Sequence, residues 1–145
     1  MAHLFSSICT CHHGAVDTRS QFDQAAHARI LLDELQLLWV DDYYDGPLSG
    51  MLTYRNRLHR YECPDGPMAI ERRYVIRELS DEEIADEQYW HELFVRHVGD
   101  HMTFRNDGQR GAVRPSSEHS KFYEPYGKRT TPDYSMRPIV GWFKL

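Results

Sequence analysis

The chain has 145 residues, of which 41% are hydrophobic and 27% charged, and its formal net charge at pH 7 is −5. This composition is typical of one globular domain and excludes a globally disordered chain. No apolar run approaches the ~20 residues of a membrane-spanning helix, so no membrane span is predicted. The N-terminus lacks the basic segment and apolar run of a signal peptide, and we expect a cytoplasmic protein. Three cysteines, an odd number, favour free thiols over a disulfide framework.

The charge is unevenly distributed along the sequence. Segment 105–138 carries a net charge of +3, whereas the rest of the chain carries −8. So acidic a body would repel a phosphate backbone, and nucleic acid is therefore not the predicted partner. The scattered charges of 105–138 are typical of a solvated loop, although this segment could contact an anionic partner.

The predicted elements begin after an irregular, polar segment, 1–19. Ser20 is a favourable N-cap residue, and the apolar positions that follow it predict a helix from Ser20 to about Glu34. The run 35–44 is dense in apolar and aromatic residues and is followed by Asp45-Gly46-Pro47. This pattern predicts a buried strand that ends in a tight turn.

The next two strands, 51–55 and 58–63, are expected to form a hairpin with Asn56 and Arg57 as its turn. This turn sets Leu52 opposite Tyr61. The more apolar face of the hairpin then carries Leu52, Tyr54, His59 and Tyr61. The other face is mostly polar, and so clear a division supports the proposed register.

A further strand is expected over 69–79, which is rich in Ile, Val and Tyr. Directly after it, Ser80-Asp81-Glu82-Glu83 forms a capping box, because Ser80 can accept from the Glu83 amide while Glu83 accepts from the Ser80 amide. Apolar residues then recur at helical spacing as far as Val98, and Gly99 is placed to end the helix.

The last part of the chain is expected to be a long irregular loop, 105–138, followed by a C-terminal strand within 139–145. The order of helix, strands and helix predicts the α+β class, with a mainly antiparallel sheet of about four to five strands and two helices packed on it. One domain therefore spans 1–145, and its core lies within 20–104.

The acidic and aromatic segment 41–50 is the predicted ligand-contacting loop, because a rigid strand positions the residues that follow it. Its carboxylates could bind a hard cation, act as a general base or accept hydrogen bonds from a polar ligand. Strand alternation would place Asp41 and Asp42 on opposite faces, which argues against a metal site. Simple turn chemistry is the alternative for Asp45. The predicted ligand-binding residues are Asp42, Tyr44, Asp45 and Trp90.

Histidines provide further candidates. His59 lies on the apolar face of the hairpin, where a histidine is more often a hydrogen-bonded core group, although its pKa can be strongly perturbed. His91 lies in the capped helix within Trp-His-Glu, but the second histidine of the zinc-protease motif is missing. The candidate catalytic residues are His59, His91 and Asp45.

Soft-metal ligands cluster near the N-terminus, at Cys9, Cys11, His12 and His13. Zinc accepts such side chains, but structural zinc sites pair two groups of ligands, and no second group is evident here. We therefore predict no cofactor, with zinc as the alternative.

Three hypotheses about function follow. The first is a non-catalytic binding or regulatory domain that engages a protein partner or small polar ligand through 41–50 and 105–138. It is motivated by the absence of the hydrolase elbow, Walker and dinucleotide motifs. The second is a small hydrolase, metal-assisted or not, with a histidine base and an aspartate of the acidic loop as orienting carboxylate. The third is an inhibitor or immunity-like protein whose acidic body masks a basic surface.

Overall fold

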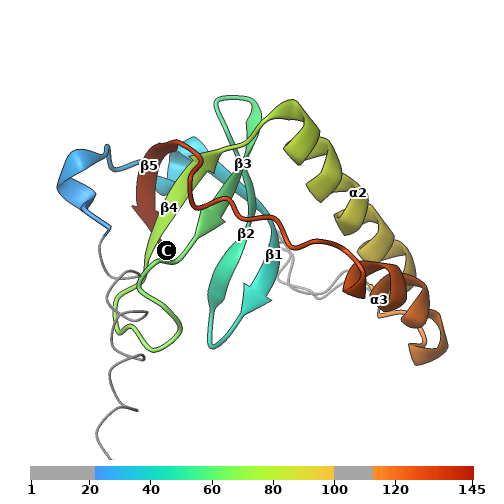
Figure 1. The fold of residues 1–145 in the computed structure, drawn as a ribbon. Coiled ribbons are helices and arrows are strands. Elements are labelled where there is room, and N and C mark those ends of the chain that lie inside the picture. The colour runs from blue at the N-terminus through green and yellow to red at the C-terminus, as the bar shows by residue number, and fades with distance from the viewer. Residues whose placement is uncertain (1–21, 100–112) are drawn as a thin grey trace, which may run out of the picture.

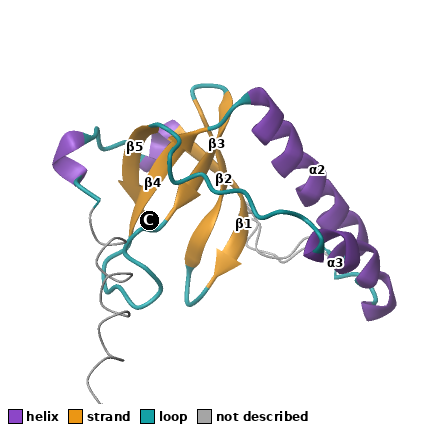
Figure 2. Cartoon of the chain, viewed as in Figure 1, coloured by secondary structure: helices purple, strands orange, loops and turns teal. Residues whose placement is uncertain are grey.

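Residues 22–99 and 113–145 are described by the computed structural model, and they form a five-stranded sheet with two helices to one side (Figure 1). Figure 2 shows the same view coloured by secondary structure. The strands are β1 (Leu35–Tyr43), β2 (Pro47–Tyr54), β3 (Arg57–Glu62), β4 (Arg73–Glu78) and β5 (Ile139–Lys144). The helices are α2 (Asp81–His97) and α3 (Ser120–Gly127), with short 3-10 turns η1 (Gln24–Ala26), η2 (Leu32–Glu34) and η3 (Ser116–Glu118). The strands pair in sequence order and antiparallel, which confirms the predicted α+β class.

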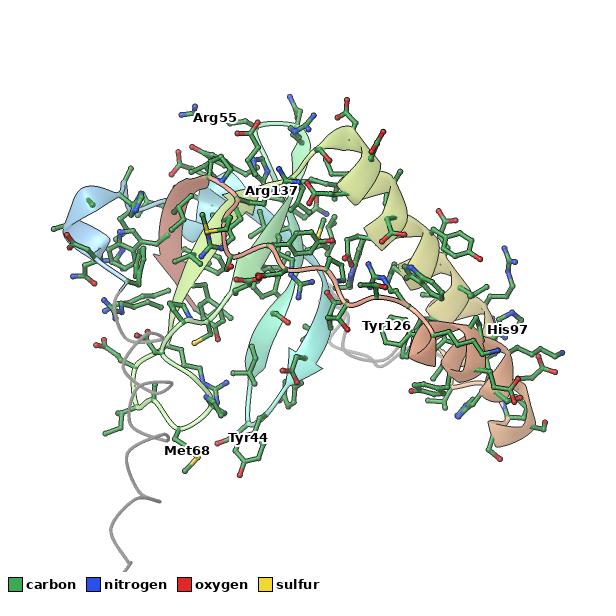
Figure 3. The ribbon with its side chains drawn as sticks, viewed as in Figure 1. Tyr44, Arg55, Met68, His97, Tyr126 and Arg137 are labelled. Carbon is green, nitrogen blue, oxygen red and sulfur yellow. The ribbon has the colours of Figure 1, made fainter. Side chains whose placement is uncertain are left out.

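The β2–β3 hairpin has the predicted faces but a different register. Its turn consists of Arg55 and Asn56, whose φ values are 50° and 60°, and Leu52 lies opposite His59 rather than Tyr61. Figure 3 shows Arg55 at the tip of this hairpin. Two consecutive positive φ values define a type I′ turn, whose twist matches that of the strands. Because side chains alternate with a period of two, the two-residue shift leaves each of them on its predicted face.

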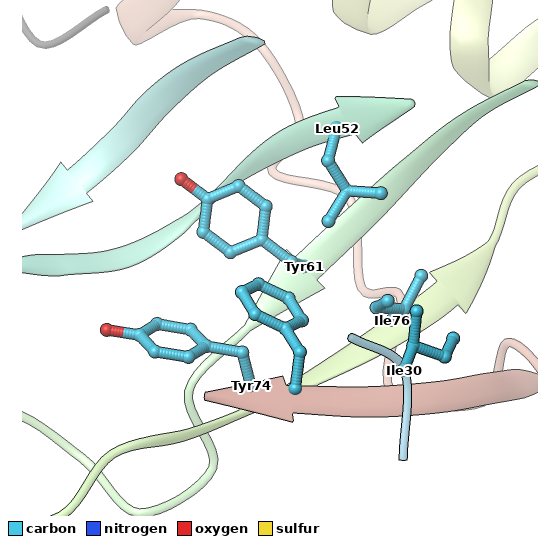
Figure 4. Packing of buried hydrophobic residues seen from close by; sticks show 6 residues of the cluster. Ile30, Leu52, Tyr61, Tyr74 and Ile76 are labelled. Carbon is cyan, nitrogen blue, oxygen red and sulfur yellow. The ribbon is translucent and has the colours of Figure 1, made fainter. Parts of the chain in front are cut away.

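Both faces of the sheet bury side chains. One cluster is centred on Ile30, Leu52, Tyr61, Tyr74, Ile76 and Phe143 (Figure 4). The cluster on the opposite face contains Trp39, Met51, Leu79 and Tyr134. Tyr134 belongs to the segment that crosses the sheet between α3 and β5 (Figure 1). The hairpin face predicted to be mostly polar is therefore partly buried, because this segment and the start of α2 pack against it.

The predicted helix over 20–34 is wrong within the described residues 22–34. Between the two 3-10 turns the chain is extended and lies beside β5. The Ile30 N–H donates to the Trp142 carbonyl at 2.8 Å, and the Trp142 N–H donates to the Ala28 carbonyl at 3.0 Å. Ile30 is only 4% exposed. Burial against a distant strand therefore outweighs the local helix pattern.

The capped helix is confirmed as α2. The Glu83 N–H donates to Ser80 Oγ at 3.2 Å, and the Ser80 N–H donates to Glu83 Oε1 at 2.9 Å. Gly99, with a φ of 140°, follows the end of the helix. The preceding strand, β4, begins at Arg73, four residues later than predicted, and Ile70 is fully exposed.

Helix α3 was not predicted, and it lies inside the segment 105–138 that was expected to be a loop. It is short and contains Pro125, so its sequence carries little local helix signal. Packing on α2 stabilises it instead: Phe122 is 5% exposed, and its ring lies edge-on to Phe94 with 5.2 Å between centroids. Neither helix, nor any other in the described ranges, has the length and apolar character needed to cross a membrane.

Candidate functional site

A cavity of about 390 Å³ lies between the end of β1, the middle of α2, and α3 with the residues that follow it. Four charged side chains line it, namely Asp41, Asp42, Glu87 and Arg129. Its wall is largely aromatic, with contributions from Trp39, Tyr43, Trp90, Phe122, Tyr123 and Tyr126. A mainly apolar wall with a few polar groups, at this volume, is typical of a small-molecule site. We refer to it as the aromatic cavity.

Strand β1 brings Trp39 to the cavity through an irregularity in its pairing with β2. Leu37 pairs with Leu52 and Trp39 pairs with Met51, so β1 has one additional residue between these two pairs. A bulge of this kind shifts the alternation of side chains. Leu37 therefore packs with one core cluster, whereas Trp39 packs with the cluster on the opposite face.

A second irregularity places two neighbouring carboxylates at the cavity. Val40 pairs with Gly50 and Asp42 pairs with Ser49, which leaves Asp41 as the additional residue. Both Asp41 and Asp42 line the cavity. The expectation that strand alternation keeps them apart is therefore wrong, because a bulge interrupts the period of two on which it depended.

A buried polar network joins α2 to the segment that follows α3. Glu87 is 6% exposed, and its Oε1 atom accepts from the Tyr134 hydroxyl at 2.5 Å and from Arg129 Nη2 at 2.8 Å. The same guanidinium donates to Asp86 at 2.6 Å. Burial, and then the hydrogen bond to Glu87, raise the pKa of Tyr134. Burial opposes the charge of Arg129, but the two carboxylates outweigh it and raise the pKa of Arg129.

The carboxylates of the cavity differ in what compensates their charge. Asp41 accepts a hydrogen bond from Arg60. Burial raises the pKa of Asp41, Arg60 opposes this, and the nearby Glu87 carboxylate raises it further. Glu87 is compensated by Arg129. The side chain of Asp42 is exposed and has no hydrogen bond or ion pair within the described ranges; Asp42 lines this cavity and also a second, open depression that Arg60 lines.

Aromatic rings connect the elements around the cavity. His91 of α2 stacks face to face on Trp39 of β1, with 3.9 Å between centroids and 4° between planes. The guanidinium of Arg129 lies over the rings of Trp90 and Tyr126, at 5.6 and 5.7 Å from their centroids. The wall of the cavity thus already holds one of the protein's own cations against aromatic faces.

The predicted site residues separate into two groups. Asp42, Trp90 and His91 line the aromatic cavity. Tyr44 and Asp45 belong to the β1–β2 turn and line a separate, open depression instead. Asp45 and the glycine after it have φ values of 48° and 121°, which fits the alternative that Asp45 serves the turn. Figure 3 shows Tyr44 at the tip of this turn and Tyr126 on α3.

His59 is a core group and does not line the cavity. It is 6% exposed, and its Nδ1 lies 2.9 Å from the Arg57 carbonyl oxygen. Because a carbonyl can only accept, Nδ1 carries the proton of the neutral ring. Burial lowers the pKa of His59, against the opposing effect of this hydrogen bond.

We expect His59 to destabilise the fold in acid. Since its pKa in the folded protein lies below the ordinary value of 6.5, the unfolded chain binds the proton more readily, and stability present above that value is lost as the pH falls. Between about pH 7 and pH 5, the free energy of unfolding should decrease more steeply for the wild type than for His59→Gln. Denaturant titrations at each pH measure both slopes, and equal slopes would contradict the prediction.

The predicted metal ligands Cys9, Cys11, His12 and His13 lie outside the described residues. Within ranges 22–99 and 113–145, no group of three or more His, Cys, Asp or Glu side chains could hold a metal ion. Cys63 is a free, partly buried thiol, and burial raises its pKa. Its environment therefore does not activate it as a nucleophile.

Three residues important to the site, Glu87, Arg129 and Tyr134, were not among the candidates. A signal for Glu87 exists, because α2 residues 84, 87, 91, 94 and 98 follow the alternating three- and four-residue steps of a packed helical stripe. A carboxylate in such a stripe requires a buried partner. No comparable local signal identifies Arg129 or Tyr134 as that partner.

Segments 41–50 and 105–138, both predicted to contact a ligand, each contribute to the aromatic cavity. The first provides Asp41, Asp42 and Tyr43, and the second provides α3 and Arg129. Comparison of the chain with protein-family models, curated protein sequences and solved structures gives no match. The cavity's own residues therefore carry the functional proposal.

Proposed function

We propose that the protein is a binding domain and that the aromatic cavity is its ligand site. The observation that carries this proposal is the convergence of β1, α2 and α3 on a space of about 390 Å³, with aromatic walls and, at Asp42, a carboxylate that forms no ion pair or hydrogen bond with the described residues. Its occupant is a small polar ligand or a protruding side chain of a protein partner. Few polar groups on an apolar wall suit such a ligand, because they orient it while the wall excludes water.

The rim of the cavity supports the same function. Tyr43, Tyr123 and Tyr126 are 48%, 52% and 40% exposed. Tyrosine combines a large apolar area with a hydroxyl and is enriched where proteins contact ligands and partners. Exposed rings gathered around a cavity are typical of a surface that a ligand or partner covers.

The distribution of the candidate catalytic residues favours binding over hydrolysis. Only His91 lines the cavity, and its ring is stacked on Trp39. His59 is buried beside the β2–β3 turn, whereas Asp45 lies in the β1–β2 turn at the other end of β2. A histidine base and its orienting carboxylate need hydrogen-bond contact, which these positions do not offer to His59 and Asp45.

Nuclear magnetic resonance on the full chain tests this proposal. The probes are N-acetyl amino-acid amides with cationic, anionic, neutral polar and apolar side chains. We expect at least one class to shift the indole N–H signals of Trp39 and Trp90, which line the cavity, and to leave Trp142 unshifted. Trp142 is an internal control, since its Nε1–H donates to the His27 carbonyl at 3.2 Å, away from the cavity. If no class shifts the cavity signals, or if all three indoles shift alike, the proposal fails.

A further inference from the structure

We infer that the aromatic cavity binds a cation, namely a guanidinium or ammonium group on an aliphatic stem. This inference rests on the proposed binding function and specifies its ligand. Three features carry it: the charge balance of the cavity, the way its wall holds Arg129, and the two half-exposed tyrosine rings, Tyr43 and Tyr123, that line it.

Among the residues that the structure describes, negative charge exceeds positive charge at the cavity. Four carboxylates lie in or directly beside it, Asp41, Asp42, Asp86 and Glu87, and two guanidiniums compensate them, Arg60 and Arg129. Asp86 and Glu87 share a single arginine, and Asp42 has no partner among the described residues. An anionic ligand would meet this excess at close range and be repelled, whereas a cation would reduce it.

The binding mode of Arg129 shows that this environment accommodates a guanidinium. Its guanidinium carbon lies over the rings of Trp90 and Tyr126, and its Nη2 donates to Asp86 and Glu87. Aromatic faces together with carboxylate acceptors are the two kinds of contact that a guanidinium prefers. Arg129 satisfies one such set of contacts from inside the protein.

A second set of the same kind is open to a ligand. Asp42 provides a carboxylate that has no ion pair or hydrogen bond with the described residues, and Tyr43 and Tyr123 provide rings that are about half exposed. Among the described residues, no arginine guanidinium lies over either ring. Asp42 would accept the charged head while these rings contact its face and stem, as Glu87, Trp90 and Tyr126 do for Arg129.

Matched probes separate charge from shape. N-acetyl-arginine amide and N-acetyl-citrulline amide are nearly isosteric, but only the first is charged; N-acetyl-lysine amide tests the ammonium. Tryptophan fluorescence and the indole N–H signals of Trp39 and Trp90 report binding. We expect the citrulline probe to bind roughly tenfold more weakly than the arginine probe, because it lacks a charge-assisted contact to Asp42.

Two aspartate variants locate the contact. Asp42→Asn keeps the shape of an exposed side chain and removes its charge, and it should weaken the arginine probe roughly tenfold. Asp45→Asn removes an exposed carboxylate three residues along, outside the cavity, and should leave the affinity unchanged. Tyr123→Ser should weaken the arginine probe while changing the affinity of the citrulline probe much less, since a cation gains more from a ring face.

The outcomes distinguish this inference from the proposed function. If the citrulline or an anionic probe binds as tightly as the arginine probe, or if Asp42→Asn binds as the wild type does, the cation inference is overturned and the binding function stands. If no probe reaches the cavity, both fail together.

A peptide arm identifies the source of the cation. A peptide of about twelve residues with one central arginine should bind more tightly than the single amide if a partner protein supplies the side chain, because flanking residues add contacts. Tighter binding of the free amide than of the peptide would assign the cavity to a small molecule. Either result supports a cationic ligand. The inference would be overturned if the citrulline versions of the amide and the peptide bound as tightly as the arginine versions.

Discussion

Replacing Glu87 by alanine should lower the free energy of unfolding by about 3–5 kcal/mol, the usual cost of removing one partner from a buried ion pair. The side chain of Glu87 is 7% exposed, and that of Arg129 is 11% exposed. Without the carboxylate, the Tyr134 hydroxyl loses its acceptor, and among the described carboxylates Arg129 keeps only the half-exposed Asp86. Chemical denaturation followed by circular dichroism measures the loss.

A second glutamate of α2 provides the control. Glu92 is exposed, and its side chain has no hydrogen bond or ion pair with the described residues, so Glu92→Ala should change stability by less than about 0.5 kcal/mol. Glu87→Gln should fall between the two alanine variants, since its amide oxygen still accepts while the charge is lost. Equal stability of Glu87→Ala and Glu92→Ala would contradict the network around Glu87.

The parts of the fold that the sequence predicts correctly depend on local patterns. The capping box at Ser80 needs only four consecutive residues, and it is formed as predicted. The faces of the β2–β3 hairpin are also predicted correctly. Leu52 pairs with a residue of β3 two positions away from the predicted one, and a shift of two residues leaves every side chain on the same face. The run 35–44 was dense enough in apolar residues to predict β1 almost to its last residue.

The errors arise where distant residues decide the structure. Residues 22–34 have helical spacing, but Ile30 is buried against β5, more than a hundred residues away along the chain. Helix α3 depends on packing against α2 rather than on its own propensity. The bulges in β1 depend on how that strand pairs with β2, and the sequence of β1 alone does not predict this pairing.

The same distinction applies to the site. Asp42, Trp90 and His91 were candidates because polar and aromatic residues at element ends are visible in the sequence. Their shared cavity was not visible, since α3 closes it. Arg129 belongs to a segment predicted to be a basic loop, and only the folded structure shows that its charge is directed inward, to Glu87, and not toward a partner.

Gly50→Ala should destabilise the protein by about 1–3 kcal/mol, because overpacking displaces the backbone that surrounds it. A Cβ atom at Gly50 would overlap the carbonyl oxygen of Trp39 and lie 2.6 Å from Tyr61 Oη. The Tyr61 hydroxyl already donates to that carbonyl at 3.3 Å, so neither neighbour can retreat without breaking a buried contact. Trp39 also lines the aromatic cavity. In Gly50→Ala its indole N–H signal should therefore shift, and the variant should bind a cationic probe more weakly than the wild type does.

Gly127→Ala is the matched substitution. A Cβ atom there would meet nothing within 4 Å, and Gly127 ends α3. Alanine is the better helix former by about 0.5–1 kcal/mol, so this variant should gain stability or keep it. The two glycine variants should thus move the midpoint of thermal unfolding in opposite directions. A Gly50→Ala protein as stable as the wild type would show that β1 and β2 do not approach each other closely at Trp39, and the position assigned to the cavity's indole would then be wrong as well.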